Sequence, residues 1–128
     1  MARQILFTEK DKIEGLARIE DLREGVPTHV TFKSDVTGVS DPSLSGKNEG
    51  EGDITLKANN TIEANYKGVL KTNDGRQLQW DSDEKSKVDG GKVKGKEKVR
   101  IRDRQFPQPI DMDTEMDSSG KVTNTAYK

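Results

Sequence analysis

Two glutamates, Glu84 and Glu97, are the residues of this chain whose types and predicted positions could perform acid–base chemistry. They lie in two alternating apolar and polar segments that are joined by the turn sequence Asp89-Gly90-Gly91-Lys92. If Val88 faces Val93 across that turn, the same register places the two glutamates opposite one another on the apolar face. Two facing carboxylates in a closed interior would raise the pKa of one of them, an arrangement that acid–base catalysis uses.

The residues around this pair are small or polar, which indicates a space in the middle of the predicted interior. The small or polar residues that fall on the same face are Gly68, Ser82, Ser86, Gly95 and Thr114. Larger side chains on this face complete the expected lining of a polar-centred pocket. The candidate ligand-binding residues are Tyr66, Trp80, Glu84, Glu97 and Met112.

A purely structural interpretation of the same residues stays open. Glu84 and Glu97 lie near hairpin ends, where strands often project past the core into water. Tyr66 and Trp80 are typical core aromatics, and Trp80 is predicted to cover Gly68 on the neighbouring strand.

Three functions follow from these interpretations. We expect a non-enzymatic domain that binds a small molecule in the pocket. The first alternative is an isomerase or hydrolase that uses Glu84 and Glu97 as an acid–base pair. The second is a protein-interaction domain that dimerises by a strand edge, which the hydrophobic content of only 29% makes reasonable.

Other site chemistries find little support in the residues. The chain has no cysteine, which excludes thiolate chemistry and Cys-ligated metals. His29 is the only histidine, so it cannot build a multi-histidine metal site, although it could act as a general base. The glycines of Gly46–Gly52 are not followed by a predicted helix, and their acidic neighbours would repel a phosphate. We therefore predict no metal site and no cofactor.

Period-two alternation predicts the elements that position the candidate residues. Strands are expected at Val30–Val36, Glu63–Thr72, Gln77–Val88 and Lys92–Arg104, with shorter ones around Ile54–Leu56, Ile110–Met116 and Lys121–Tyr127. Turn sequences rich in Asn, Asp and Gly join them, which predicts an all-β antiparallel meander that closes into a small barrel.

The remaining segments are less regular. Residues 1–128 are expected to form a single domain, with a flexible loop at about Asp41–Glu51. Gln4–Thr8 favours a first strand, whereas the spacing of Ile13, Leu16, Ala17 and Glu20 also suits a short N-terminal helix.

Charges alternate along two of the predicted strands. The basic residues are Lys92, Lys94, Lys96, Lys98, Arg100 and Arg102, and the acidic ones are Asp111, Asp113, Glu115 and Asp117. Folding the chain about Gln105–Gln108 would place Arg102 opposite Asp111 and Lys98 opposite Glu115. Because acidic neighbours neutralise the basic strand and the net charge is −1, we expect no nucleic-acid partner.

The segment Glu63–Trp80, with the run Tyr66-Lys67-Gly68-Val69-Leu70-Lys71-Thr72-Asn73-Asp74-Gly75, resembles hairpins of small lipocalin-like (calycin-type) barrels and of uncharacterised prokaryotic single-domain barrels. The resemblance implies a barrel architecture and assigns no functional residues. The chain departs from the lipocalin pattern, because the Gly-x-Trp signature near the first strand is absent and the single tryptophan is Trp80.

The sequence also bounds location and assembly. No segment approaches the roughly 20 apolar residues of a membrane span, and the first residues do not resemble a signal peptide. We expect a cytoplasmic protein without a membrane partner, either a monomer or a homodimer.

Overall fold

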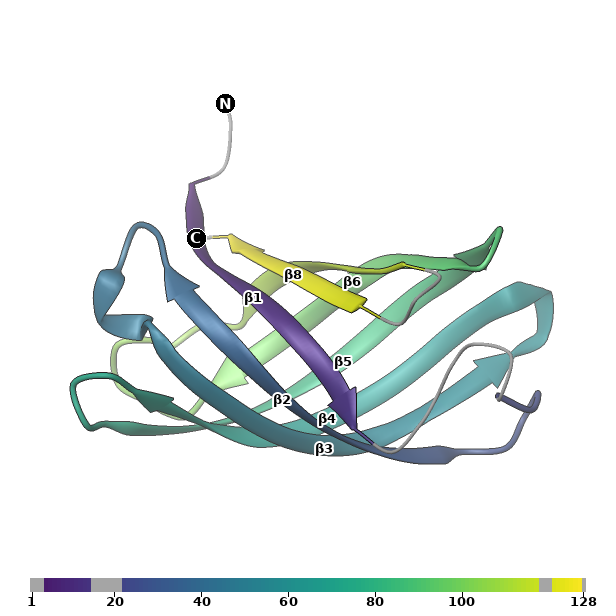
Figure 1. Ribbon diagram of the computed structural model, residues 1–128, viewed down its shortest axis with the longest axis horizontal. Helices are drawn as coiled ribbons and strands as arrows, with labels where there is room; N and C mark the ends of the chain where they lie inside the picture. Colours follow the sequence, from purple (N-terminus) through teal and green to yellow (C-terminus); the bar gives the residue numbers. More distant parts are fainter. Residues whose placement is uncertain (1–3, 15–21, 118–120, 128) are drawn as a thin grey trace.

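Eight antiparallel strands form a meander in which each strand pairs with the next and the last pairs with the first (Figure 1). The computed structural model describes residues 4–14, 22–117 and 121–127. The strands are β1 (Ile5–Glu14), β2 (Thr28–Gly38), β3 (Gly46–Lys57), β4 (Thr61–Thr72), β5 (Gln77–Asp89), β6 (Lys92–Ile101), β7 (Ile110–Met116) and β8 (Lys121–Tyr127). The predicted all-β meander and its closure into a barrel are confirmed.

Residues with a left-handed backbone make the tight turns, as the turn chemistry predicts. Asn59 and Asn60 have φ values of 63° and 57° in the short 3₁₀ turn between β3 and β4. Gly75 (φ 92°) turns the chain between β4 and β5, and Gly90 and Gly91 (φ 60° and 80°) turn it between β5 and β6. Only glycine, and to a smaller degree asparagine, adopts this conformation at low cost.

These turns fix the registers on which the candidate site depends. Gly68 lies opposite Trp80 on β4 and β5, and Val88 lies opposite Val93 on β5 and β6. Glu84 consequently lies opposite Glu97. All three pairings agree with the sequence-based register.

The predicted pairing of the two charged strands is wrong by four residues. Lys98 faces Asp111 instead of Glu115, so the predicted opposition of Arg102 and Asp111 is also lost. The cause is the connection at residues 102–109, which is longer than the predicted turn at Gln105–Gln108. Its backbone turns at Asp103, whose carbonyl accepts a hydrogen bond from the amide of Phe106, and the Phe106 ring packs against the core.

The predicted flexible loop at Asp41–Glu51 is also wrong over most of its length. Pro42–Leu44 forms a 3₁₀ turn, capped by the Asp41 side chain, and Leu44 is fully buried. From Gly46 onward the chain belongs to β3, which pairs with both β2 and β4. Small residues in this segment alternate with charged ones, and backbone hydrogen bonds to two neighbours hold it as a strand.

The N-terminal prediction is resolved in part. The expected strand at Gln4–Thr8 corresponds to β1, which begins at Ile5 and ends at Glu14. The alternative short helix would have begun at Ile13, which lies in β1, and the rest of it lies outside the described residues. No helix among the described residues is long and apolar enough to cross a membrane.

Apolar side chains fill the barrel as two separate clusters. The first, which we call the Phe7 cluster, includes Phe7, Phe32, Leu70, Leu78, Trp80, Val99, Ile101, Ile110, Met112 and Ala126. The second, the Val30 cluster, consists of Leu22, Val30, Ile62 and Val93, with Ile54, Leu56, Val88 and Met116 packed against it. Tyr66 contacts both clusters, and the candidate site lies between them.

Candidate functional site: a cavity in the barrel interior

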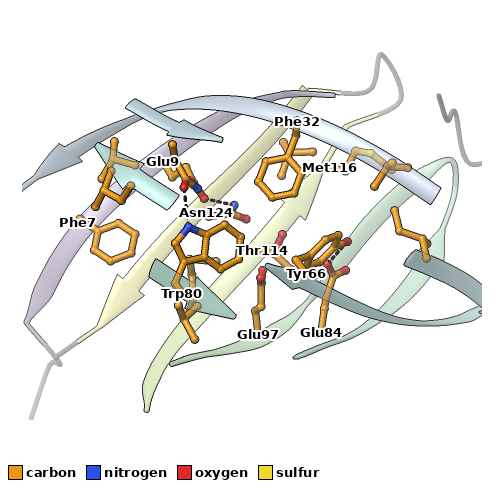
Figure 2. Close-up of a pocket in the computed structure, with 18 of the residues that line it drawn as sticks. Phe7, Glu9, Phe32, Tyr66, Trp80, Glu84, Glu97, Thr114, Met116 and Asn124 are labelled. Carbon is orange, nitrogen blue, oxygen red and sulfur yellow. Dashed lines mark hydrogen bonds between the residues drawn. The ribbon is translucent and has the colours of Figure 1, made fainter. Parts of the chain in front are cut away.

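A cavity of about 90 Å³ lies inside the barrel and extends between the two apolar clusters (Figure 2). Its polar part is a belt of buried side chains contributed by most of the strands. The buried polar residues that line the cavity are Glu9, Asn48, Glu84, Glu97, Thr114 and Asn124. The buried hydroxyls of Ser34, Ser82 and Ser86 donate hydrogen bonds to the three glutamates. All five predicted ligand-binding residues, Tyr66, Trp80, Glu84, Glu97 and Met112, line the cavity.

Glu84 and Glu97 are buried in this interior, with only 9% and 6% of their surface exposed. The alternative interpretation, in which both side chains project into water at hairpin ends, is therefore wrong. Glu84 accepts hydrogen bonds from the Tyr66 hydroxyl at 2.9 Å and from the Ser86 hydroxyl at 2.5 Å. Glu97 accepts one from the Ser82 hydroxyl at 2.5 Å.

Burial raises the pKa of both carboxyl groups, and repulsion by Glu84 adds to the rise at Glu97. Loss of hydration raises the pKa of Glu84, against the hydrogen bonds from Ser86 and Tyr66. Burial and the facing charge of Glu84 raise the pKa of Glu97 to about 8. Glu97 therefore binds and releases its proton near neutral pH, as a group able to act as an acid, a base or a hydrogen-bond donor.

A third buried carboxylate, Glu9 on β1, was not among the predicted site residues. It lies opposite Asn124 of β8, whose amide donates to it at 2.8 Å. The Asn48 amide and the Ser34 hydroxyl donate at 2.7 and 2.6 Å. The carboxylate of Glu9 thus accepts hydrogen bonds from three neutral donors on three strands, which stabilises it in the interior.

Asn48 also connects Glu9 to the aromatic wall of the cavity. Its side-chain carbonyl accepts a hydrogen bond of 2.6 Å from the indole Nε1 of Trp80. Because its amide group donates to Glu9 at the same time, the side chain of Asn48 is fixed in orientation. The tryptophan ring is consequently held in one position against the cavity.

Three aromatic rings form one wall, each seated over a glycine of a neighbouring strand. A Cβ atom at Gly68 would lie 2.7 Å from the Trp80 ring, and one at Gly50 would lie 2.5 Å from Phe32. The third ring, Tyr66, covers Gly52 in the same way. The Phe32 centroid lies 5.6 Å from that of Tyr66 and 5.9 Å from that of Trp80. The glycines therefore determine where the rings lie.

The charge of the lining is one-sided. Glu9, Glu84 and Glu97 line the cavity, and no lysine, arginine or histidine is among the described residues that line it. Within the same residues, no group of three or more His, Asp or Glu side chains is placed to hold a metal ion.

His29 lies away from this cavity. Its Nδ1 is 3.0 Å from Oδ1 of Asp53 and its Nε2 is 3.3 Å from Oε2 of Glu51, with 56% of the side chain exposed. The hydrogen bond with Asp53 raises the pKa of His29. The structure does not bring His29 together with Glu84 and Glu97, and its contacts with Asp53 and Glu51 lie on the exposed surface.

The basic strand β6 faces acidic partners on the outside of the barrel. Arg100 contacts Asp81 at 2.5 Å and Asp83 at 3.1 Å. On the other side, Lys94 lies 3.9 Å from Glu115 of β7. These contacts counter the positive charge of the strand, as the alternating pattern indicates.

Searches of protein-family models, of curated proteins and of solved structures find no match to this chain. Its class is defined by the fold and the site: an antiparallel eight-stranded β-barrel with an acidic, aromatic-walled interior cavity.

Proposed function

We propose that the protein binds a small organic molecule inside its barrel and does not transform it. The observation that supports this most directly is the cavity between the Phe7 and Val30 clusters. It combines apolar and aromatic walls with a few oriented polar groups, which is the usual composition of a ligand site. The side chains that face it are held in place by hydrogen bonds and by packing, so the site is formed before a ligand arrives.

The size of the cavity limits the ligand. A water molecule needs roughly 10–15 Å³ of such space, whereas pockets for drug-sized ligands measure roughly 300–1,000 Å³. At about 90 Å³ this cavity is larger than a water site and smaller than a drug pocket. The proposed ligand therefore has only a few non-hydrogen atoms in the cavity.

An acid–base enzyme, an isomerase or hydrolase, is the second candidate. The observation that favours it is the position of Glu97 opposite Glu84, with a pKa that burial raises to about 8. Dimerisation by a strand edge is less well supported, because β1 and β8 pair and leave no full-length free edge among the described strands.

The proposal is tested by detecting ligands in the cavity of the full chain. A set of neutral, cationic and anionic fragments of the size of tert-butanol is screened by NMR, with the indole N–H of the single tryptophan, Trp80, as the reporter. The variant Val122→Phe fills the cavity from β8, and Val39→Phe makes the same change at a site that is 51% exposed.

We expect at least one fragment to shift the Trp80 signal in the wild type and in Val39→Phe, and none to do so in Val122→Phe. If no fragment shifts the signal, or if Val122→Phe binds as the wild type does, the proposal is wrong. Conversion of a fragment that Glu97→Gln abolishes would favour the enzyme instead.

A further inference from the structure

We infer that the ligand of this cavity is a small organic cation, an ammonium compound that Glu97 and Glu84 bind against the aromatic wall. This inference rests on the proposed function and names the chemical class of its ligand. It depends on the charges, the unequal hydrogen bonding and the aromatic rings of the cavity.

The first argument is the lack of positive charge. Three carboxyl groups, those of Glu9, Glu84 and Glu97, line one cavity, and no cationic side chain lies among the described residues around them. A buried carboxylate is costly unless a proton, a set of hydrogen-bond donors or a cation compensates it. A bound cation would supply the charge that the lining lacks.

The second argument is that the three carboxyl groups are compensated to different degrees. Glu9 accepts from Ser34, Asn48 and Asn124, which is a complete set of donors for a structural carboxylate. For Glu97, Ser82 is the one hydrogen-bond donor among the described residues, and it reaches only Oε1.

The second oxygen of Glu97 is therefore available to a ligand. Glu97 is only 6% exposed, and its side chain points into the cavity between Trp80 and Tyr66 (Figure 2). Glu84, directly across the strand pair, places a second carboxyl group beside the same space.

The third argument is the aromatic wall. Phe32, Tyr66 and Trp80 lie together along the cavity, and the centroid of Phe32 is 5.6 Å from that of Tyr66 and 5.9 Å from that of Trp80. The faces of such rings attract cations, and their surfaces suit the alkyl groups of an amine. A metal ion would gain little from these rings, and the described residues offer no three-ligand metal cluster.

The charged groups that act on Glu97 are all acidic. Glu84 lies opposite Glu97 on β5, and Asp83 precedes Glu84 on the same strand and faces outward. These two residues and Glu9 of β1 all raise the pKa of Glu97. Met112 faces Glu97 from β7 and is uncharged, and the Tyr66 hydroxyl from β4 donates to Glu84. Without a ligand Glu97 therefore keeps its proton at neutral pH. A bound ammonium ion favours the carboxylate, so binding displaces this proton to the solvent.

The test compares tert-butylammonium with tert-butanol, which has the same shape and no charge, and with pivalate, which is anionic. Binding to the full chain is measured by calorimetry at pH 6, 7, 8 and 9, in two buffers that differ in ionisation enthalpy. Glu97→Gln is compared with Glu115→Gln, which removes one carboxylate from the exposed face of β7.

We expect the ammonium compound to bind at least about tenfold more tightly than tert-butanol, and pivalate to bind more weakly than both. The affinity of the ammonium compound should increase about tenfold for each unit by which the pH is raised towards 8, and it should level off above pH 8. At pH 7, binding should release about one proton. Glu97→Gln should reduce both the proton release and the pH dependence, whereas Glu115→Gln should keep both at the wild-type level.

The inference is overturned if tert-butanol or pivalate binds the cavity as tightly as the ammonium compound, or if binding releases no proton from the wild type. Because either result still shows a ligand in the cavity, the proposed function would survive it. If none of the three probes and no other fragment binds, both proposals fail. Displacement of the ammonium compound by Ca²⁺ or Mg²⁺ at equal concentration would assign the site to a metal ion instead.

Discussion

Glu84 and Glu97 lie directly opposite one another on β5 and β6, and both side chains enter the barrel interior. Strands normally place apolar pairs at such positions, because a facing pair of buried carboxyl groups destabilises the fold. The Ser82, Ser86 and Tyr66 hydroxyls reduce this cost without removing it. A protein with such a pair at the centre of its barrel has a group that responds to protons near neutral pH.

The stability of the unliganded protein should depend on the protonation of Glu97. Its pKa is about 8 in the folded state and about 4.5 when the side chain is exposed, so the folded state holds a proton that the unfolded chain has released between these values. The free energy of unfolding should therefore fall as the pH rises from about 4.5 to 8, by up to about 1.4 kcal/mol per pH unit. Urea unfolding at intervals of one pH unit measures this slope. Glu97→Gln should reduce this slope and leave the part that comes from Glu84, whose pKa burial also raises. Parallel profiles for the two proteins would contradict the assignment.

Removing the carboxylate of Glu9 should destabilise the barrel. Glu9→Ala leaves the Ser34, Asn48 and Asn124 donors without their acceptor, and each unsatisfied buried group costs about 1–3 kcal/mol. The control is Glu49→Ala, because Glu49 is exposed on β3. Denaturation followed by Trp80 fluorescence gives both free energies. Equal stability of the two variants would show that the hydrogen-bond network has no net effect.

Gly68 should not tolerate a side chain. In Gly68→Ala the new Cβ would collide with the Glu49 carbonyl oxygen and lie 2.7 Å from the Trp80 ring. Overpacking of this kind costs about 1–3 kcal/mol, and it should also change the near-ultraviolet dichroism of Trp80. Lys67→Ala, next to it on the exposed face, should leave both properties unchanged. An unaltered Trp80 spectrum in Gly68→Ala would contradict the contact.

Two lysines on the outer face of β6 should respond differently to charge reversal. Lys98 lies between Asp83 and Asp111, whereas Lys96 lies between Lys85 and Asp113. Lys98→Glu replaces two attractions with two repulsions and should cost about 1 kcal/mol at low salt, and added salt should reduce the loss. Lys96→Glu exchanges one repulsion for another and should be nearly neutral. If Lys98→Glu raises the free energy of unfolding, this strand register is wrong.

The registers of the central hairpins were predictable from the sequence because their turns are short. Gly75 and the pair Gly90 and Gly91 each require a left-handed backbone at one place, which leaves little freedom in how the flanking strands align. The opposition of Glu84 and Glu97, and the face on which Tyr66 and Trp80 lie, follow from these turns. The face of Met112 follows from the alternation of charged and apolar residues along its own strand.

The register between β6 and β7 could not be predicted in the same way. Alternation of charged and apolar residues excludes a slip of one residue, but a slip of two or four residues returns each side chain to the same face. The observed register goes with the packing of Phe106 and the turn at Asp103 in the long connection. Neither feature produces a periodic pattern in the sequence.

Two residues of the candidate site, Asn48 and Glu9, were not predicted from the sequence, for a related reason. Asn48 lies in a segment whose glycine content suggests a loop, although Gly46, Gly50 and Gly52 alternate with charged residues at the spacing of a strand. That period was the available signal. Glu9 depends on Asn124, its partner 115 residues away, and no local pattern in a sequence indicates such a pairing.

The pairing of β1 with β8 also determines the order in which the barrel can assemble. Each of the other strand pairs joins neighbours in the chain, so it can form at a modest cost in loop entropy, whereas closure must bring together the two ends of the meander. The hydrogen bond from Asn124 to Glu9 cannot form before that step. We therefore expect the carboxylate of Glu9 to remain hydrated in an open, sheet-like intermediate, and to lose its water only when the last seam of the barrel closes.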